Sequence, residues 1–230
     1  MTISDRVKSV RQRMENAAAK AGRRAEEITL VGVTKTQPAE AVRELILAGV
    51  DVIGENRVQE LLQKAPLLQG LPHKTHLIGH LQRNKAKFLP GNIDMLQSLA
   101  SEETLLALEK VYQDKNTALD VLIEVNIGEE SSKSGIDAGA VSALADRVLQ
   151  SGVLRLRGLM AIPPATEGEA VRTYFRQMRQ LFIDIQAKTM DNNTVNVLSM
   201  GMSSDFEYAI LEGATMVRVG TELFGPRQYH

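Results

Sequence analysis

The sequence contains no cysteine and no tryptophan, and aromatic residues make up only 4% of its 230 residues. The lack of cysteine excludes disulfides, thiolate metal sites and a cysteine nucleophile, and it fits a reducing compartment. The net charge is only −1, from 27 basic and 28 acidic residues, so we expect neither nucleic acid nor an anionic membrane as a partner. No apolar run approaches the roughly 18 residues that a membrane-spanning helix needs.

The first 22 residues are polar and periodic, unlike a signal peptide, so we expect a cytoplasmic protein. Their apolar stripe predicts a helix with Ser4 as its N-cap and a stop at Gly22. The chain is 43% apolar, and no Pro/Gly-rich linker divides it. We therefore expect one domain over residues 1–230, and we expect a monomer because no long apolar helix face is left over.

Beyond residue 28, short apolar runs alternate with helical patterns. The candidate strands are 29–34, 51–54, 75–79, 93–97, 119–126, 155–161, 195–199 and 214–219. The candidate helices begin near 38, 56, 82, 101, 137, 167 and 203, with a short last one near Thr221. Continuously apolar strands are typical of parallel sheets covered on both faces. Eight such units in about 200 residues predict an α/β protein, a (β/α)8 TIM barrel with an extra N-terminal helix; a doubly wound open sheet is the alternative.

Polar residues gather at the carboxyl ends of the predicted strands, where barrels place their chemistry. Lys35 follows the first strand. Burial there would lower its pKa and leave free amine for a Schiff base with a carbonyl ligand. The alternative is a lysine whose side chain reaches solvent.

Two glycine-containing turns follow the last two strands. In the first, residues 199–205, Gly201 permits close backbone approach, and a helix N-terminus would attract an anion. Ser204 and Glu207 have the spacing of a capping box, so an ordinary helix start is the alternative. In the second turn, Gly220 and Thr221 offer further N–H groups to the same phosphate.

Arg218 would sit in the barrel mouth, where a fixed charge needs a partner. It would donate to an aromatic nitrogen or a carboxylate, or form an internal salt bridge with Glu55 or Glu124. A phosphate anchor and a Schiff-base lysine in one mouth indicate pyridoxal 5′-phosphate. A phosphosugar substrate of an aldolase-type lysine has the same needs and is the alternative.

The successive segments TLVGVTKTQP, GENRVQE, THLIGHLQRNK, EVNIGEESSKSGI, GLMAIPP, LSMGMSSDFEYAI and MVRVGTELFG resemble the motifs of the YggS/PROSC family of pyridoxal phosphate homeostasis proteins. The resemblance runs in order from about residue 29 to 225. Thr75 departs from it, since many members carry an aromatic residue there. The resemblance implies a barrel related to the barrel half of bacterial alanine racemase, with pyridoxal phosphate (vitamin B6) held as a covalent aldimine on Lys35.

The resemblance also implies the rest of the cofactor site. Arg218 would face the pyridine nitrogen and keep it unprotonated, which makes the ring a weaker electron sink. The phosphate would contact Ser199, Gly201, Gly220 and Thr221. The ring would contact Asn56, His76 and Met200.

The function implied is a carrier that acts in pyridoxal phosphate homeostasis and in amino-acid and keto-acid balance, without robust catalysis. It would hand the cofactor to apo-enzymes. Lys133 lies in a polar loop, where we expect a lysine in solvent; the alternative is that it captures cofactor in transit. A racemase-like enzyme is the alternative, but racemisation needs an acid/base on each face of the substrate carbon, and only Lys35 is a candidate. We expect no metal site, because His76 and His80 have no third ligand.

Overall fold

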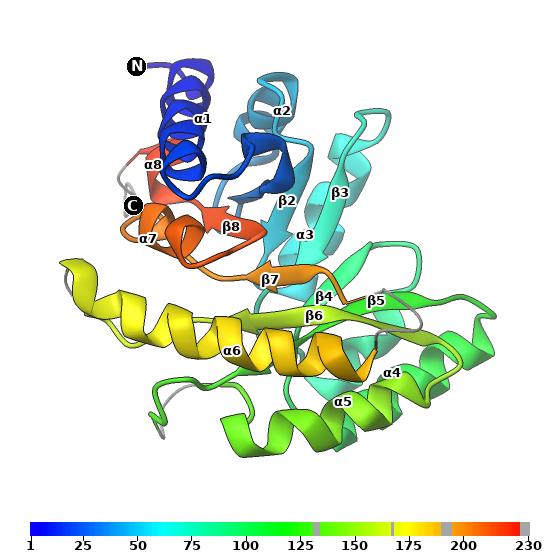
Figure 1. Ribbon diagram of the computed structural model, residues 1–230. Helices are drawn as coiled ribbons and strands as arrows, with labels where there is room; N and C mark the ends of the chain where they lie inside the picture. Colours follow the sequence, from blue (N-terminus) through cyan, green and yellow to red (C-terminus); the bar gives the residue numbers. More distant parts are fainter. Residues whose placement is uncertain (131–133, 167, 190–194, 226–230) are drawn as a thin grey trace.

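The computed structural model describes residues 1–130, 134–166, 168–189 and 195–225. Eight parallel strands close into a barrel in chain order, and the first strand pairs with the last. Their bounds are β1 Thr29–Val33, β2 Val52–Glu55, β3 Lys74–Leu77, β4 Met95–Leu99, β5 Leu119–Val125, β6 Leu154–Ala161, β7 Val197–Ser199 and β8 Met216–Val219. The TIM barrel is confirmed, and the open sheet is excluded because no edge is left unpaired in the β-sheet (Figure 1).

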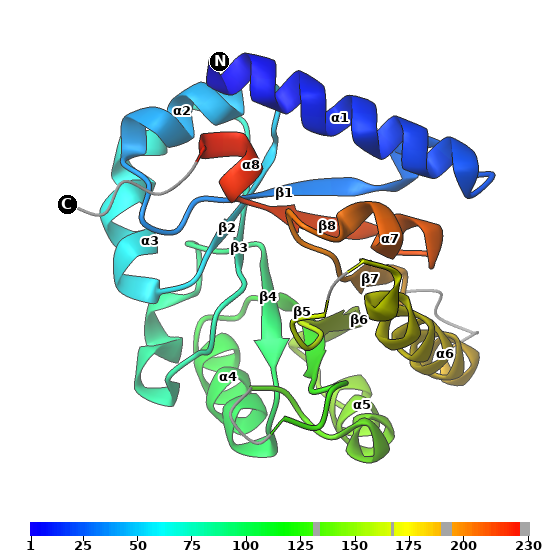
Figure 2. The same cartoon turned by 90° about the vertical axis from the view of Figure 1, so that its left-hand side faces the viewer.

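Helices surround the barrel on the outside (Figure 1). The α-helices are α1 Ile3–Lys20, α2 Ala39–Leu47, α3 Val58–Lys64, α4 Glu102–Asp114, α5 Val141–Leu149, α6 Arg172–Lys188, α7 Phe206–Leu211 and α8 Thr221–Phe224. The extra helix α1 lies along the β1–β8 side and contacts α2, α7 and α8 (Figure 2). No helix in the described ranges is long and apolar enough to cross a membrane.

Helix α1 buries the predicted stripe, which includes Val7, Val10 and Met14. Its N-cap is Thr2, so the prediction of Ser4 is wrong. The Thr2 hydroxyl accepts from the Asp5 N–H at 3.1 Å, and the Thr2 N–H donates to the Asp5 carboxylate at 2.9 Å. This reciprocal capping box satisfies two N–H groups at once, which a start at Ser4 would leave unpaired.

The helix predicted near 82 is wrong in type, and the helices predicted near 137, 167 and 203 begin later, at Val141, Arg172 and Phe206. After β3 the chain forms a 3-10 helix, Arg83–Phe88, and no α-helix, because Pro90 and Gly91 end the segment. Short 3-10 turns also precede α5 and α6, at Ala138–Ala140 and Gly168–Val171, and delay both helices.

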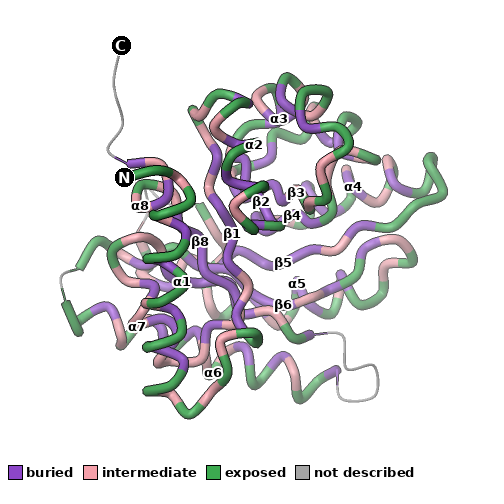
Figure 3. Tube along the Cα trace, turned by 90° about the horizontal axis from the view of Figure 1, so that it is seen from above, coloured by how far each residue is buried: buried purple, intermediate pink, exposed green. Residues whose placement is uncertain are grey.

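Most side chains inside the barrel are apolar, but a row of polar side chains lies among them. Val31, Val52 and Met216 form one inner cluster, and Met95, Leu122 and Met160 form another. Four polar side chains are buried among them: His76, Gln97, Ser199 and Arg218. The strands are buried along most of their length (Figure 3), so these polar groups must bond to one another.

Candidate functional site

Lys35 lies in the turn beyond β1, half-buried, at the carboxyl end of the barrel. It lines a pocket of about 420 Å³ together with Arg218, Gly220 and Thr221. These four residues were predicted to meet, and the barrel brings them together. The rest of the lining comes from Val33, Gln37, Met202, Ser203, Ser204 and Gly225.

Side chains of α3 form hydrogen bonds with the turn that carries Lys35. The Thr34 carbonyl accepts from Lys64 Nζ at 2.7 Å, and the Thr36 N–H donates to Glu60 Oε1. Lys64 Nζ also donates to Glu60 Oε1 at 2.7 Å. Thr36 has φ +63°, which is unfavourable for a β-branched residue. Both neighbours of Lys35 are therefore fixed by one pair of charges.

Glu55 completes this buried cluster. Its Oε1 accepts from Lys64 Nζ at 2.8 Å and from the Thr34 hydroxyl at 2.6 Å, and its Oε2 has no partner in the described residues. Burial raises the pKa of Glu55, and the hydrogen bonds from Lys64 and Thr34 oppose that shift. The predicted alternative of a salt bridge between Arg218 and Glu55 is therefore wrong, because Glu55 pairs with Lys64.

The loop after β7 is shaped by Gly201. Its φ is +91°, and a Cβ there would lie 2.5 Å from the Ala209 Cβ and 2.9 Å from the Phe206 Cα, so only glycine fits. The predicted capping box between Ser204 and Glu207 is wrong. Asp205 occupies the N-cap position of α7, and its carboxylate accepts from the Met202 N–H at 2.6 Å.

The two glycine-containing turns are joined at the pocket. The Gly220 N–H donates to Ser203 Oγ at 3.3 Å. The backbone N–H groups of Ser203, Ser204 and Thr221 have no protein acceptor among the residues described, and all three residues line the Lys35 pocket. Unpaired N–H groups of this kind are the usual ligands of a phosphate.

Arg218 is only 3% exposed. Burial lowers its pKa to about 10, so it stays charged at neutral pH. Its Nη1 donates to Ser199 Oγ at 2.7 Å and its Nη2 to the Ala161 carbonyl at 2.9 Å. No carboxylate of the described residues forms a salt bridge with it. The alternative bridge to Glu124 is also absent, because Glu124 Oε1 accepts from the Ser134 hydroxyl at 2.6 Å.

Five predicted site residues do not line the Lys35 pocket. The Ser199 hydroxyl is bonded to Gln97 and Arg218 inside the barrel, and Met200 is fully buried in the outer core. Gly201 faces Phe206 and Ala209 of α7. The other two line different cavities, Asn56 beside His80 and His76 at the opposite end of the barrel.

Ser203, Ser204 and Lys64 were missed as site residues. The serines lie within the predicted glycine turn, but which of its hydroxyls faces the pocket depends on the turn conformation. Lys64 carries one signal, its spacing of four from Glu60 on a helix. Lys133 lies outside the described residues, and no group of three metal-binding side chains is found in the parts of the chain that are described.

Comparison with known proteins matches residues 7–228 to the alanine racemase N-terminal domain. Pyridoxal phosphate homeostasis proteins of Aquifex aeolicus and Escherichia coli K12 are 42% and 40% identical to the chain; the first match covers 100% of both chains, the second 99% of this chain and 97% of the relative. The chain belongs to the pyridoxal phosphate homeostasis protein family. Another similar protein is PipY of Synechococcus elongatus, solved with pyridoxal phosphate bound, at 31% identity and a TM-score of 0.84, covering 97% of this chain and all of PipY.

The homeostasis-protein barrel also resembles that of a larger enzyme. Alanine racemase of Corynebacterium glutamicum superposes with a TM-score of 0.67 at 16% identity, which shows a common fold. The match covers 96% of this chain but 62% of the racemase. The family member described here thus corresponds to the barrel part of that enzyme.

Proposed function

We propose that this protein binds pyridoxal 5′-phosphate reversibly at the Lys35 pocket and acts in its homeostasis. The observation that carries the proposal is the convergence of Lys35, Arg218 and three unpaired N–H groups on one pocket of about 420 Å³. Family membership supports it, because the relatives are named for this role and PipY was solved with the cofactor.

The residues of the pocket fit the parts of this cofactor. The N–H groups of Ser203, Ser204 and Thr221 would hold the phosphate, and Gly220 lets the backbone approach closely. Arg218, fixed and charged, would face the pyridine nitrogen. The Lys35 amine would bond covalently to the aldehyde carbon with loss of one water. When bound, the cofactor supplies an aldehyde that reacts reversibly with amines.

We further propose that the protein is a carrier without robust catalysis. Racemisation needs a second acid/base opposite the lysine, and the described lining of the pocket contains neither tyrosine nor histidine. Arg218 disfavours a protonated pyridine nitrogen, which weakens the ring as an electron sink. Its proposed setting is the cytoplasm, as a monomer, with apo-enzymes as acceptors.

The test combines the visible spectrum with mass analysis. We expect the purified protein to take up pyridoxal phosphate, to show an absorption band that borohydride bleaches, and to carry the reduced adduct on the peptide containing Lys35. Lys35→Ala should lack the band, whereas Lys87→Ala, at an exposed position, should keep it. A protein that stays colourless with added cofactor would refute the proposal. Sustained turnover of amino acids would refute the carrier role alone.

A further inference from the structure

The extra helix α1 packs against the two short helices that follow the glycine-containing turns of the Lys35 pocket. Helix α7 begins directly after the first turn, and α8 begins at Thr221, within the second. Both helices contact α1 (Figure 2). Ser203 and Ser204 of the first turn and Thr221 of the second line the pocket. A side chain of α1 that holds both helices would therefore also hold the two turns.

Arg13 is a side chain of α1 that holds both helices. Its Nη2 donates to the Glu207 carboxylate of α7 at 2.7 Å, and its Nη1 donates to the Glu222 carboxylate of α8. The guanidinium also lies over the Phe206 ring, 4.6 Å from the ring centroid, where a cation and an aromatic face attract each other. One planar group thus joins α1, α7 and α8, and its fork of N–H donors suits two carboxylates at once.

The partners of Arg13 adjoin the residues that shape the turns. Glu222 directly follows Thr221, whose N–H faces the pocket without a protein acceptor in the described residues. Phe206 is fully buried, and a Cβ on Gly201 would lie 2.9 Å from its Cα. Phe206 also directly precedes Glu207. A movement of either carboxylate would therefore be passed to the backbone of its turn.

The direct connection between the two turns at the pocket is weak. Among the described residues it consists of one hydrogen bond, from the Gly220 N–H to Ser203 Oγ at 3.3 Å, which is longer than the usual range. A phosphate held by N–H groups of both turns needs a fixed separation between them, because its hydrogen bonds require donor–acceptor distances of about 2.7–3.2 Å. The bridge through Arg13 supplies a second connection.

We propose that Arg13 is a positioning residue of the phosphate site, which holds the two turns at the separation that a phosphate requires. This inference rests on the proposed function in taking the Lys35 pocket as a phosphate site. Arg13 is not part of the described lining of that pocket, so it would act through the turns and would not touch the ligand. Its side chain is 35% exposed, and ion pairs this exposed add little to stability, so we expect variants at this position to fold.

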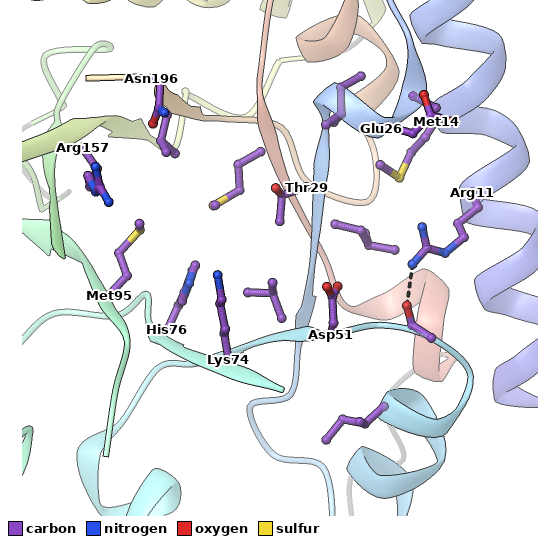
Figure 4. Close-up of a pocket in the computed structure, with 18 of the residues that line it drawn as sticks. Arg11, Met14, Glu26, Thr29, Asp51, Lys74, His76, Met95, Arg157 and Asn196 are labelled. Atoms are coloured by element: carbon purple, nitrogen blue, oxygen red, sulfur yellow. Dashed lines mark hydrogen bonds between the residues drawn. The ribbon is translucent and has the colours of Figure 1, made fainter. Parts of the chain in front are cut away.

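The test measures binding of inorganic phosphate to the full protein by titration calorimetry, in the absence of pyridoxal phosphate. Arg13→Met should weaken phosphate binding about tenfold, as expected for the loss of two partly exposed ion pairs and a ring contact. Arg11→Met is the matched control on the same helix. Arg11 donates to the Gly49 carbonyl at 2.5 Å (Figure 4) and contacts neither turn, so this variant should bind phosphate as the unchanged protein does.

Two further measurements separate positioning from other effects. Arg13→Lys keeps the net charge but removes the planar fork that reaches both carboxylates, so it should also weaken phosphate binding. Pyridoxal, which lacks the phosphate, reports on Lys35 without the turns. Its affinity, measured from the visible band, should be the same in Arg13→Met and the unchanged protein, whereas the affinity for pyridoxal phosphate should fall in Arg13→Met.

Four results would overturn the proposal. They are no phosphate binding by the unchanged protein, unchanged phosphate binding in Arg13→Met, the same loss in Arg11→Met, and an equal loss of pyridoxal affinity in Arg13→Met. Full phosphate binding by Arg13→Lys would also overturn it, because net charge alone would then explain the effect. The expected phosphate results in a protein that does not take up pyridoxal phosphate would refute the proposed function and support the role of Arg13.

Discussion

Replacing Lys64 with methionine should destabilise the protein in a pH-dependent way. The Lys64 ammonium donates to the Thr34 carbonyl at 2.7 Å, to Glu60 at 2.7 Å and to Glu55 at 2.8 Å. Methionine has a similar length and no charge, so the change leaves the Glu55 carboxylate buried with one remaining donor, the Thr34 hydroxyl. Removing one partner of a buried ion pair costs about 3–5 kcal/mol, and we expect a loss within that range at neutral pH.

The pH dependence follows from Glu55. Burial already raises the pKa of Glu55, and without Lys64 the folded-state pKa rises further above the unfolded value. A carboxyl of this kind stabilises the fold fully below its unfolded pKa and loses that contribution as pH rises through the folded pKa. The difference in unfolding free energy between the two proteins should therefore shrink as pH falls from about 8 to about 5.

The assay is urea unfolding at several pH values, with Lys110→Met as control because Lys110 is exposed on α4 and forms no salt bridge with a described residue. Lys64→Met combined with Glu55→Gln should recover part of the loss, since the uncompensated charge is gone. A Lys64→Met protein within about 0.5 kcal/mol of the original, typical of surface changes, would refute the reasoning. So would a loss that does not depend on pH.

Three further predictions concern other parts of the fold. Gly201→Ala should lower the free energy of unfolding in urea more than Gly70→Ala does. Both glycines have positive φ, but only at Gly201 would the new Cβ lie 2.5 Å from the Ala209 Cβ. Equal losses in the two variants, near the roughly 1–2 kcal/mol of left-handed strain, would contradict this. Glu124→Gln should stabilise the protein increasingly as pH rises above about 4, because burial raises the Glu124 pKa and its ionised form is the one penalised; urea midpoints that move in parallel with the original would argue against it. Thr2→Ala should lose about 1 kcal/mol through the α1 cap, and Thr2→Ser, which keeps the hydroxyl, should not; if both lose the same, the cap is not the cause.

The sequence sufficed to bring Lys35, Arg218, Gly220 and Thr221 together, because chain order and the barrel rule fix which strand ends meet. It did not place Ser199. That residue also ends a strand, but its hydroxyl turns inward to Gln97, which lies 102 positions away in the chain. Such a pairing depends on the stagger of strands around the closed sheet, which no local pattern encodes.

His76 and Ser204 show the same limit at two scales. The family resemblance implies that His76 lines the cofactor ring, whereas His76 lies within β3 and lines the cavity at the other end of the barrel. Ser204 had the spacing of a cap, but Asp205 closes the turn instead. Which end of the barrel a strand residue reaches depends on its place along the strand. The cap depends on a shift of one residue in the helix start, which sequence patterns resolve poorly.

Closure of the sheet has a consequence for synthesis on the ribosome. The pairing of β1 with β8 joins Thr29 to Met216 and Gly32 to Val219, so the first strand must wait for nearly the whole chain to emerge. Until β8 is present, β1 and β7 each have one edge without a paired strand. Lys35 and Arg218 are not yet neighbours. A nascent or truncated chain therefore lacks the assembled pocket, and uptake of a ligand there reports that translation has passed residue 219.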